Sequence, residues 1–428
     1  MTNQVATLKM GQKFKRTPAG EIPVDWGASF LADVADILGG GTPDRLNPEY
    51  WKGTIPWATP TDITGTFGNT ISKTKEMISE LGLKNSAAKL MPPGSVLMTS
   101  RATLGNAVIN TVPMATNQGF TNFICKEMLH NYFLLHLIRS KTAELARLGA
   151  GSTFLEIPKS ALRKIVVPIP SLQEQQSIAE FFSALYDAIE KTNSVIAKLR
   201  ELKSGLMQQL FTKGVANHKK FKMTKLGRIP ESWDLQPCEK LCELITVGIV
   251  VQPARLYQEF GVPCLRSMNI LEDAIADERM VFISREANES HAKSKLKEGD
   301  VVAVRTGYPG TSCVVPLKYD GANCVDLVIM RPNKLLAGTF LSRFINSPAG
   351  RKQVLQGQGG LAQQHFNVGE VCKMLIPVPP VDEQQEISDV LITTDTEINN
   401  EERIKESFES LKKGLMKVLL YGKIRLRT

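Results

Sequence analysis

The stretch Val166–Phe182 reads VVPIPSLQEQQSIAEFF, and Leu375–Leu391 reads LIPVPPVDEQQEISDVL, so the two agree at one offset of 209 residues. Each stretch has a short apolar run with prolines, followed by EQQ and an apolar pattern with three- and four-residue spacing. This pattern predicts that an extended segment ends at the prolines and that a helix begins after them. Because the transition occurs twice, it indicates an internal repeat.

The repeat extends along nearly the whole chain. FKRTPAGEIPVDW (14–26) is matched by FKMTKLGRIPESW (221–233), and LKSGLMQQL (202–210) is matched by LKKGLMKVL (411–419). Between these ends Asn117 is aligned with Asn323 at an offset of 206, and the offset of the matched end motifs drifts only from 207 to 209. The chain therefore consists of two homologous halves, about 13–214 and 221–428, and we expect Trp26 and Trp233 to lie in their cores.

Each half begins with a body of mixed character. Short β-type runs such as DVVAVRT alternate with turns and with helical patterns such as NYFLLHLIRSKTAELARL, which predicts an α+β fold. The expected boundaries are 13–170 for the first body, 171–214 for a central helix, 221–380 for the second body and 381–428 for a C-terminal helix.

The two long helices carry narrow apolar stripes. Their members are, in the first, Ile178, Phe181, Leu185, Ala188, Val195, Leu199, Leu202, Leu206 and Leu210, and in the second, Ile387, Leu391, Ile398, Ile404, Phe408, Leu411, Leu415 and Leu419. Such helices favour antiparallel pairing with each other as a coiled coil, which would relate the halves by a pseudo-twofold axis. The alternative is that each helix packs on its own body. Thr394 and Glu401 fall on the second stripe, as a register signal or a partner contact.

Composition restricts the class of protein. The 428 residues include 43% hydrophobic residues but no membrane-length apolar run and no secretory signal, so we expect a cytoplasmic protein. The net charge of +9 is concentrated near the ends of both long helices, where basic residues suit a polyanion or complement the helix dipole. The seven cysteines form no C-x-x-C pair, so we expect reduced thiols and no metal site.

Motifs for catalysis are missing from the sequence. It contains no Asn/Asp-Pro-Pro-aromatic methyltransferase motif, no complete phosphate-binding P-loop, no G-x-S-x-G and no H-E-x-x-H. These absences favour a binding protein over an enzyme.

The duplicated FK.T..G.IP..W, EQQ and GLM motifs resemble those of the specificity (S) subunit of type I restriction–modification systems. The resemblance implies that each body is a target recognition domain for one half of a bipartite double-stranded DNA site, with the paired helices fixing the spacing. It also implies a non-catalytic subunit that recruits two modification (M) subunits and restriction (R) subunits. S-adenosylmethionine, ATP and Mg would then be bound by those partners.

Candidate DNA-reading residues are polar or lie in glycine turns that allow close approach. They are Gly41, Thr42, Ser100, Arg101, Thr103, Asn117, Gln118, Ser152 and Thr153 in the first half, and Arg305, Thr306, Tyr308, Asn323, Gln363 and Gln364 in the second. The alternative for each is an ordinary turn or surface position.

Candidate partner-binding residues lie in the matched motifs of the two long helices. They are Gln175, Gln176, Gly205, Gln384, Gln385 and Gly414, and the alternative for the glutamines is a capping role.

Two other functions remain open at this point. One is the specificity half of a type II-like methyltransferase system, and the other is a coiled-coil adaptor that binds no DNA.

Overall fold

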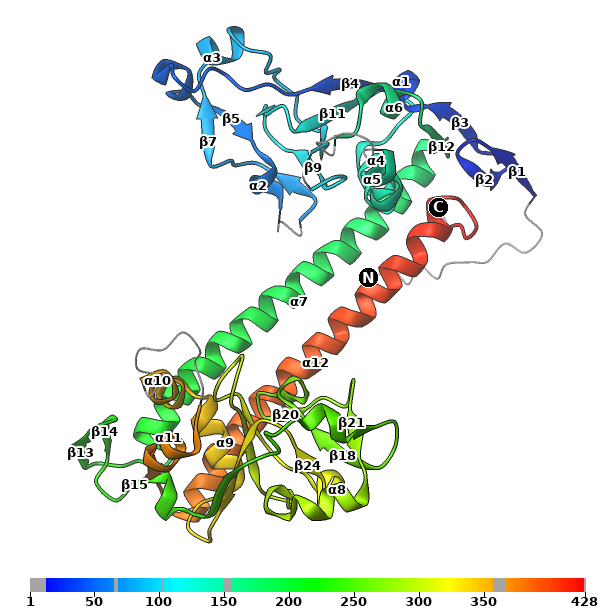
Figure 1. The fold of residues 1–428 in the computed structure, drawn as a ribbon. Coiled ribbons are helices and arrows are strands. Elements are labelled where there is room, and N and C mark those ends of the chain that lie inside the picture. Colours follow the sequence, from blue (N-terminus) through cyan, green and yellow to red (C-terminus); the bar gives the residue numbers. More distant parts are fainter. Residues whose placement is uncertain (1–12, 65–67, 102, 149–155, 357–365, 427–428) are drawn as a thin grey trace. The chain divides into compact units, whose positions relative to one another are not determined.

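The computed structural model describes residues 13–64, 68–101, 103–148, 156–356 and 366–426 (Figure 1). The chain divides into two compact units, and the division cuts both long helices. Unit 1 contains Met1–Val195 and Glu401–Thr428, and unit 2 contains Ile196–Asn400.

The body of unit 1 is built on a five-stranded sheet of order β4-β11-β8-β9-β6. Its strands are Ala35–Gly39, Phe120–Cys125, Val96–Thr99, Ala107–Asn110 and Thr70–Ile71. Every residue of β8 and β9 is buried, because helix α4 (Asn131–Ser140) contacts these two strands and contributes apolar residues to the same core.

Smaller sheets complete unit 1. They are the hairpin β1–β2 (Phe14–Thr17, Gly20–Pro23), the pair β3–β12 (Gly27–Phe30, Val166–Ile169) and the sheet β10-β5-β7 (Ala115–Thr116, Ile55–Ala58, Glu76–Ile78). The remaining helices are α1 (Leu31–Val34), α2 (Pro60–Ile63), α3 (Glu80–Lys84), α5 (Thr142–Leu148) and α6 (Lys159–Arg163).

The body of unit 2 has two four-stranded sheets. The first, β16-β25-β22-β23, comprises Cys242–Val247, Leu327–Pro332, Val301–Val304 and Ser312–Val314. The second, β17-β21-β18-β24, comprises Tyr257–Gln258, Val281–Ile283, Val262–Leu265 and Asn323–Cys324.

Three strand pairs accompany these sheets in unit 2. They are β13–β14 (Phe221–Thr224, Gly227–Pro230), β15–β26 (Asp234–Pro237, Leu375–Val378) and β19–β20 (Ile270–Leu271, Ala274–Ile275). Its shorter helices are α8 (Arg285–Ser290), α9 (Gly338–Asn346), α10 (Pro348–Gln356) and α11 (Val368–Lys373). The mixed sheets confirm the expected α+β class.

The long helices are α7 (Leu172–Lys213) and α12 (Val381–Leu419), so the second ends before residue 428. In unit 1 the first half of α7 shares a core with the last turns of α12, through Phe182 and Leu419 among others. In unit 2 Phe211, near the end of α7, shares a core with Leu391, near the start of α12. Within each unit the helices are therefore antiparallel, as predicted.

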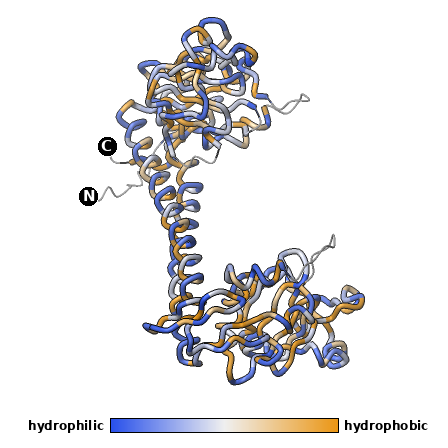
Figure 2. Tube along the Cα trace, turned by 90° about the vertical axis from the view of Figure 1, so that its left-hand side faces the viewer, coloured by the Kyte–Doolittle hydropathy of each residue, from blue (hydrophilic) through white to orange (hydrophobic). Residues whose placement is uncertain are grey.

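The buried stripe of each helix differs in part from the predicted one. One continuous series of buried or half-buried positions runs along each helix, at 178, 182, 185, 189, 192, 196, 199, 203, 206 and 210 in α7 and at 387, 391, 394, 398, 401, 405, 408, 412, 415 and 419 in α12. This regular four–three alternation includes Thr394 and Glu401, but it leaves Val195, Leu202, Ile404 and Leu411 exposed. The prediction was wrong for these four because polar residues occupy several positions of the buried stripe. Figure 2 shows the resulting mixture of hydrophilic and hydrophobic residues along both helices.

One buried histidine predicts how stability depends on pH. His136 of α4 is fully buried, with Nε2 3.2 Å from Ser183 Oγ, and burial lowers its pKa to about 3. Since the unfolded chain takes up this proton below a pH of about 6.5, the folded state should lose about 3 kcal/mol between pH 7.5 and 4.5. Urea unfolding of the wild type and of His136→Phe at both pH values measures this. Equal losses in the two proteins would contradict the assignment.

Candidate nucleic-acid interface

Three loops of unit 1 that carry separate sequence motifs meet at one place. The amide of Gly41 donates to Thr116 O (2.9 Å), and the amide of Ser100 donates to Gly119 O (2.7 Å). The Thr42 hydroxyl donates to the side-chain oxygen of Gln118. The fold therefore brings the candidates after β4, β8 and β10 together.

Two side chains of this cluster present polar groups at the surface. Gln118 is exposed, and the half-exposed Arg101 side chain pairs with Glu156 at 2.9 Å. Asn117 is half-buried, and its Oδ1 accepts from the Gly119 amide (2.8 Å). Thr42, Arg101, Asn117 and Gln118 remain candidates for base contact.

Three other candidates of unit 1 carry buried groups. Ser100 is buried with its hydroxyl on Gly119 O, and the Thr103 hydroxyl is buried. At Gly41 a Cβ would lie 2.3 Å from the backbone of Ala88, so glycine is required there by the packing of the body itself. The packing of the body itself thus accounts for Ser100 and Gly41, and DNA contact by Ser100, Thr103 and Gly41 stays a prediction.

The matching loops of unit 2 centre on Arg305. Its guanidinium donates to Asp326 Oδ1 (3.0 Å) and to Asn367 Oδ1 (3.2 and 3.3 Å). Thr306 is half-buried, and Tyr308 is 82% exposed beyond Gly307. Arg305, Thr306 and Tyr308 remain candidates.

Asn323 is removed from the candidates, and its alignment with Asn117 is wrong. In the strand register Trp57 pairs with Ala115, and Cys264 pairs with Asn323, so Asn323 corresponds to Ala115. Its amide is fully buried and binds Asn288 (2.9 Å) and Ser294 (2.7 Å). Ser152, Thr153, Gln363 and Gln364 lie outside the described residues.

Gln175 and Gln384 connect the start of each long helix to its body by hydrogen bonds. Gln175 accepts from the amide of His130 (2.8 Å) and donates to Met128 O (2.9 Å) and Pro170 O (3.0 Å). Gln384 repeats these three bonds with the amide of Ala337 and with Leu335 O and Pro379 O. Both side chains are fully buried, so the prediction that they bind a partner is wrong.

The glutamate before each of these glutamines forms a buried cluster that the motif analysis missed. Glu174 accepts from Trp26 Nε1 (3.0 Å) and from Arg425 Nε and Nη2 (both 2.7 Å). Glu383 accepts from Trp233 Nε1 (2.9 Å) and lies 2.8 Å from His218 Nε2. The third member is Arg425 in unit 1, which lies after α12, and His218 in unit 2, which lies after α7. Because both the tryptophan and the glutamate are repeated motif residues, their pairing had a signal in the sequence.

The exposed glutamine of each EQQ motif remains a partner candidate. Gln176 donates to Glu180 and Gln385 donates to Asp389, both at 2.9 Å. Gly205 and Gly414 are exposed, and a Cβ at either would meet nothing within 4 Å.

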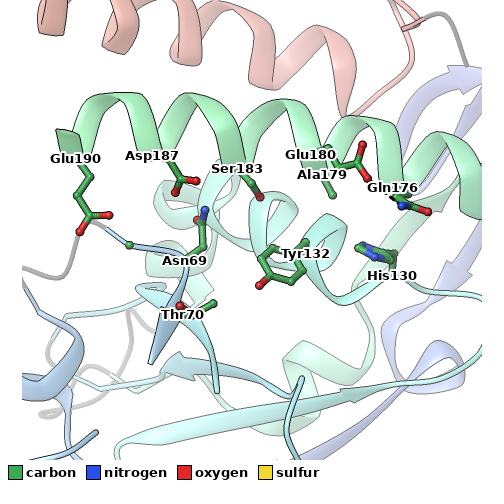
Figure 3. A pocket seen from close by; sticks show the side chains of 11 residues that line it. Asn69, Thr70, His130, Tyr132, Gln176, Ala179, Glu180, Ser183, Asp187 and Glu190 are labelled. Atoms are coloured by element: carbon green, nitrogen blue, oxygen red, sulfur yellow. Dashed lines mark hydrogen bonds between the residues drawn. The ribbon is translucent and has the colours of Figure 1, made fainter. Parts of the chain in front are cut away.

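Gln176 also lines a cavity of about 600 Å³ between α7 and the body of unit 1 (Figure 3). The helical wall carries Glu180, Asp187 and Glu190, and the opposite wall carries Asn69 and Tyr132 among others. Three carboxylates disfavour a DNA phosphate, so we do not count this cavity in the DNA interface.

In the described ranges no three His, Cys, Asp or Glu side chains are grouped so that they could hold a metal ion. None of the helices formed by the described residues is long and apolar enough to cross a membrane.

Comparison with known proteins defines the class first. A family model for the type I restriction modification DNA specificity domain matches residues 23–201. The MjaIX specificity subunit of Methanocaldococcus jannaschii is 26% identical over 97% of both chains, and the EcoKI specificity subunit of Escherichia coli is 21% identical over 86% of this chain and 82% of that one.

Solved structures agree on the fold. The crystal structure of the type I S subunit from M. genitalium has a TM-score of 0.58 at 13% identity and covers 98% of this chain and 99% of its own. A chain from a type I complex-assembly study has a TM-score of 0.56 at 18% identity, over 94% of this chain and 99% of its own. The chain is therefore similar along nearly its whole length to type I restriction–modification specificity subunits, and residues 23–201 match the model of their DNA specificity domain. A subunit of this kind is non-catalytic, and the cofactors belong to the modification and restriction subunits.

Proposed function

We propose that the two bodies read the two halves of one bipartite double-stranded DNA site. The observation that carries this proposal is the loop cluster that recurs in both bodies on matching strands but with different side chains. In unit 1 the cluster presents Arg101 and Gln118, and in unit 2 it presents Arg305 and Tyr308. A shared scaffold with unlike readers suits two unlike half-sites. Since DNA is the target, the site of action is the cytoplasm.

The long helices supply the docking faces for two identical modification subunits in this proposal, and restriction subunits join the assembly. Leu202 and Leu411 are exposed at matched positions, and each precedes an open glycine, Gly205 or Gly414, by three residues. Apolar side chains beside a glycine allow a partner helix to approach closely. A duplicated face within one chain suits two copies of one partner.

The test is DNA binding by the purified chain with and without its modification subunit. The complex should retard one duplex with two defined half-sites far better than scrambled duplexes, and its affinity should fall steeply with salt. Sequencing methylated DNA from cells that express both subunits should show adenine methylation at one bipartite motif. Crosslinking of labelled S-adenosylmethionine to the chain alone would favour the type II-like alternative, and assembly without any DNA dependence would favour the adaptor.

A further inference from the structure

Arg305, at the end of β22, has its guanidinium held from two sides. Nη1 donates to Asp326, while Nε and Nη2 donate to Asn367. A guanidinium has five N–H donors, so one N–H on Nη1 and one on Nη2 have no partner among the described residues. The side chain is 27% exposed. These two donors are held in one plane and are available to a ligand.

Asp326 and Asn367, which bond the Arg305 guanidinium, both have an unusual backbone or capping geometry. Asp326 has a φ of 50°, in the left-handed region that non-glycine residues rarely adopt. Asn367 is the N-cap of α11, yet its side chain makes no capping hydrogen bond, although asparagine is a preferred capping residue. Each side chain bonds Arg305 instead, and such local exceptions concentrate at functional sites.

The arrangement occurs in only one of the two bodies. Ser100 O accepts from the Ile157 amide (3.0 Å) as Arg305 O accepts from the Phe366 amide (2.9 Å), so Ser100 occupies the position of Arg305. Asp326 matches Gln118 when counted from the register of β24 and Gly119 when counted from that of β25, and neither of these residues is acidic. Pro158 precedes α6 as Asn367 precedes α11. The common scaffold therefore does not require the Arg–Asp–Asn group, and a role specific to the second body explains it.

We infer that Arg305 reads a guanine in the half-site bound by the second body, with Asp326 and Asn367 as positioning residues. The inference rests on the proposed function. Guanine is the base whose major-groove edge offers two acceptors, O6 and N7, to paired N–H donors. Adenine and thymine each offer one acceptor there, and cytosine offers a donor. A phosphate accepts from many directions and would not need a guanidinium held in one plane.

The test measures binding of the complex with its modification subunit to a duplex library randomised across the target. Arg305→Ala should reduce discrimination at one G·C pair of one half-site by about ten- to a hundredfold and leave the other positions unchanged. Asp326→Asn and Asn367→Ala should weaken discrimination at that same pair only, and Asn367→Asp, which keeps the acceptor, should retain it. Arg285→Ala, an exposed arginine of α8, is the matched control and should change nothing.

Arg305→Lys guards against a variant that fails to fold. It keeps the charge but lacks the planar pair of donors, so it should lose the discrimination while it keeps affinity for non-specific DNA. The inference is overturned if Arg305→Ala weakens all duplexes alike and lowers the salt slope by about one, because that is the behaviour of a phosphate contact. If the wild-type complex has no sequence preference, the proposed function itself fails before any variant is compared.

Discussion

Replacing Glu174 by alanine should destabilise unit 1 by about 3 kcal/mol. The carboxylate is 3% exposed and accepts from Trp26 and twice from Arg425. Removing one partner of a buried ion pair typically costs about 3–5 kcal/mol, because the other partner is left without compensation. The lower end applies here, since the Arg425 side chain is 23% exposed and regains water. The partnership also raises the pKa of Arg425, mainly through the hydrogen bonds to Glu174.

Urea unfolding at pH 7.5 measures this loss directly. Glu174→Gln keeps an acceptor for the Trp26 indole but not the charge, so it should lie between the alanine variant and the wild type. Glu180→Ala, an exposed glutamate on the same helix, is the control and should change stability by no more than about 0.5 kcal/mol. A loss below 1 kcal/mol in Glu174→Ala would show that the cluster contributes little to stability.

The repeat and the long helices could be predicted from sequence because they depend on local rules. Apolar residues at three- and four-residue spacing need a buried stripe whatever the surroundings are. It was harder to predict from the sequence which residues form that stripe. Lys203 occupies a stripe position by bonding Asp395, and Lys412 does so over the ring of Tyr186. A prediction from residue type alone therefore assigned Leu202 and Leu411 to the buried stripe, although both are exposed.

The errors among the candidate site residues have a common cause. Residues that are identical in the two halves tend to serve the internal packing that both bodies share. This is why Gln175 and Gln384 are buried and bond the long helices to the bodies. Asn323 was misplaced because a short strand left the register of the repeat uncertain by two residues. By contrast, the loops of Arg101 and Arg305 were selected because glycine turns follow apolar strands there, a signal that does not depend on identity between the halves.

Removing one heptad from each long helix, residues 193–199 and 399–405, should abolish recognition of the natural target if the helices set the spacing of the half-sites. The deletion preserves the four–three alternation of both buried stripes, so the helices keep their pattern. It shortens each helix by about 10 Å, which corresponds to about three base pairs along DNA at ~3.4 Å each. Three base pairs also change the rotational phase between half-sites, so affinity for the original duplex should fall at least about a hundredfold.

Methylation mapping in cells that express the shortened chain and its modification subunit provides the measurement. Any new motif should keep both half-sites and have a spacer about three base pairs shorter. Deleting 193–199 alone is the matched control, because it shortens one helix without the other and should prevent recognition of either spacing. Methylation of the original motif by the doubly shortened chain would show that the helices do not determine the spacing, since the reading bodies are unchanged in that variant.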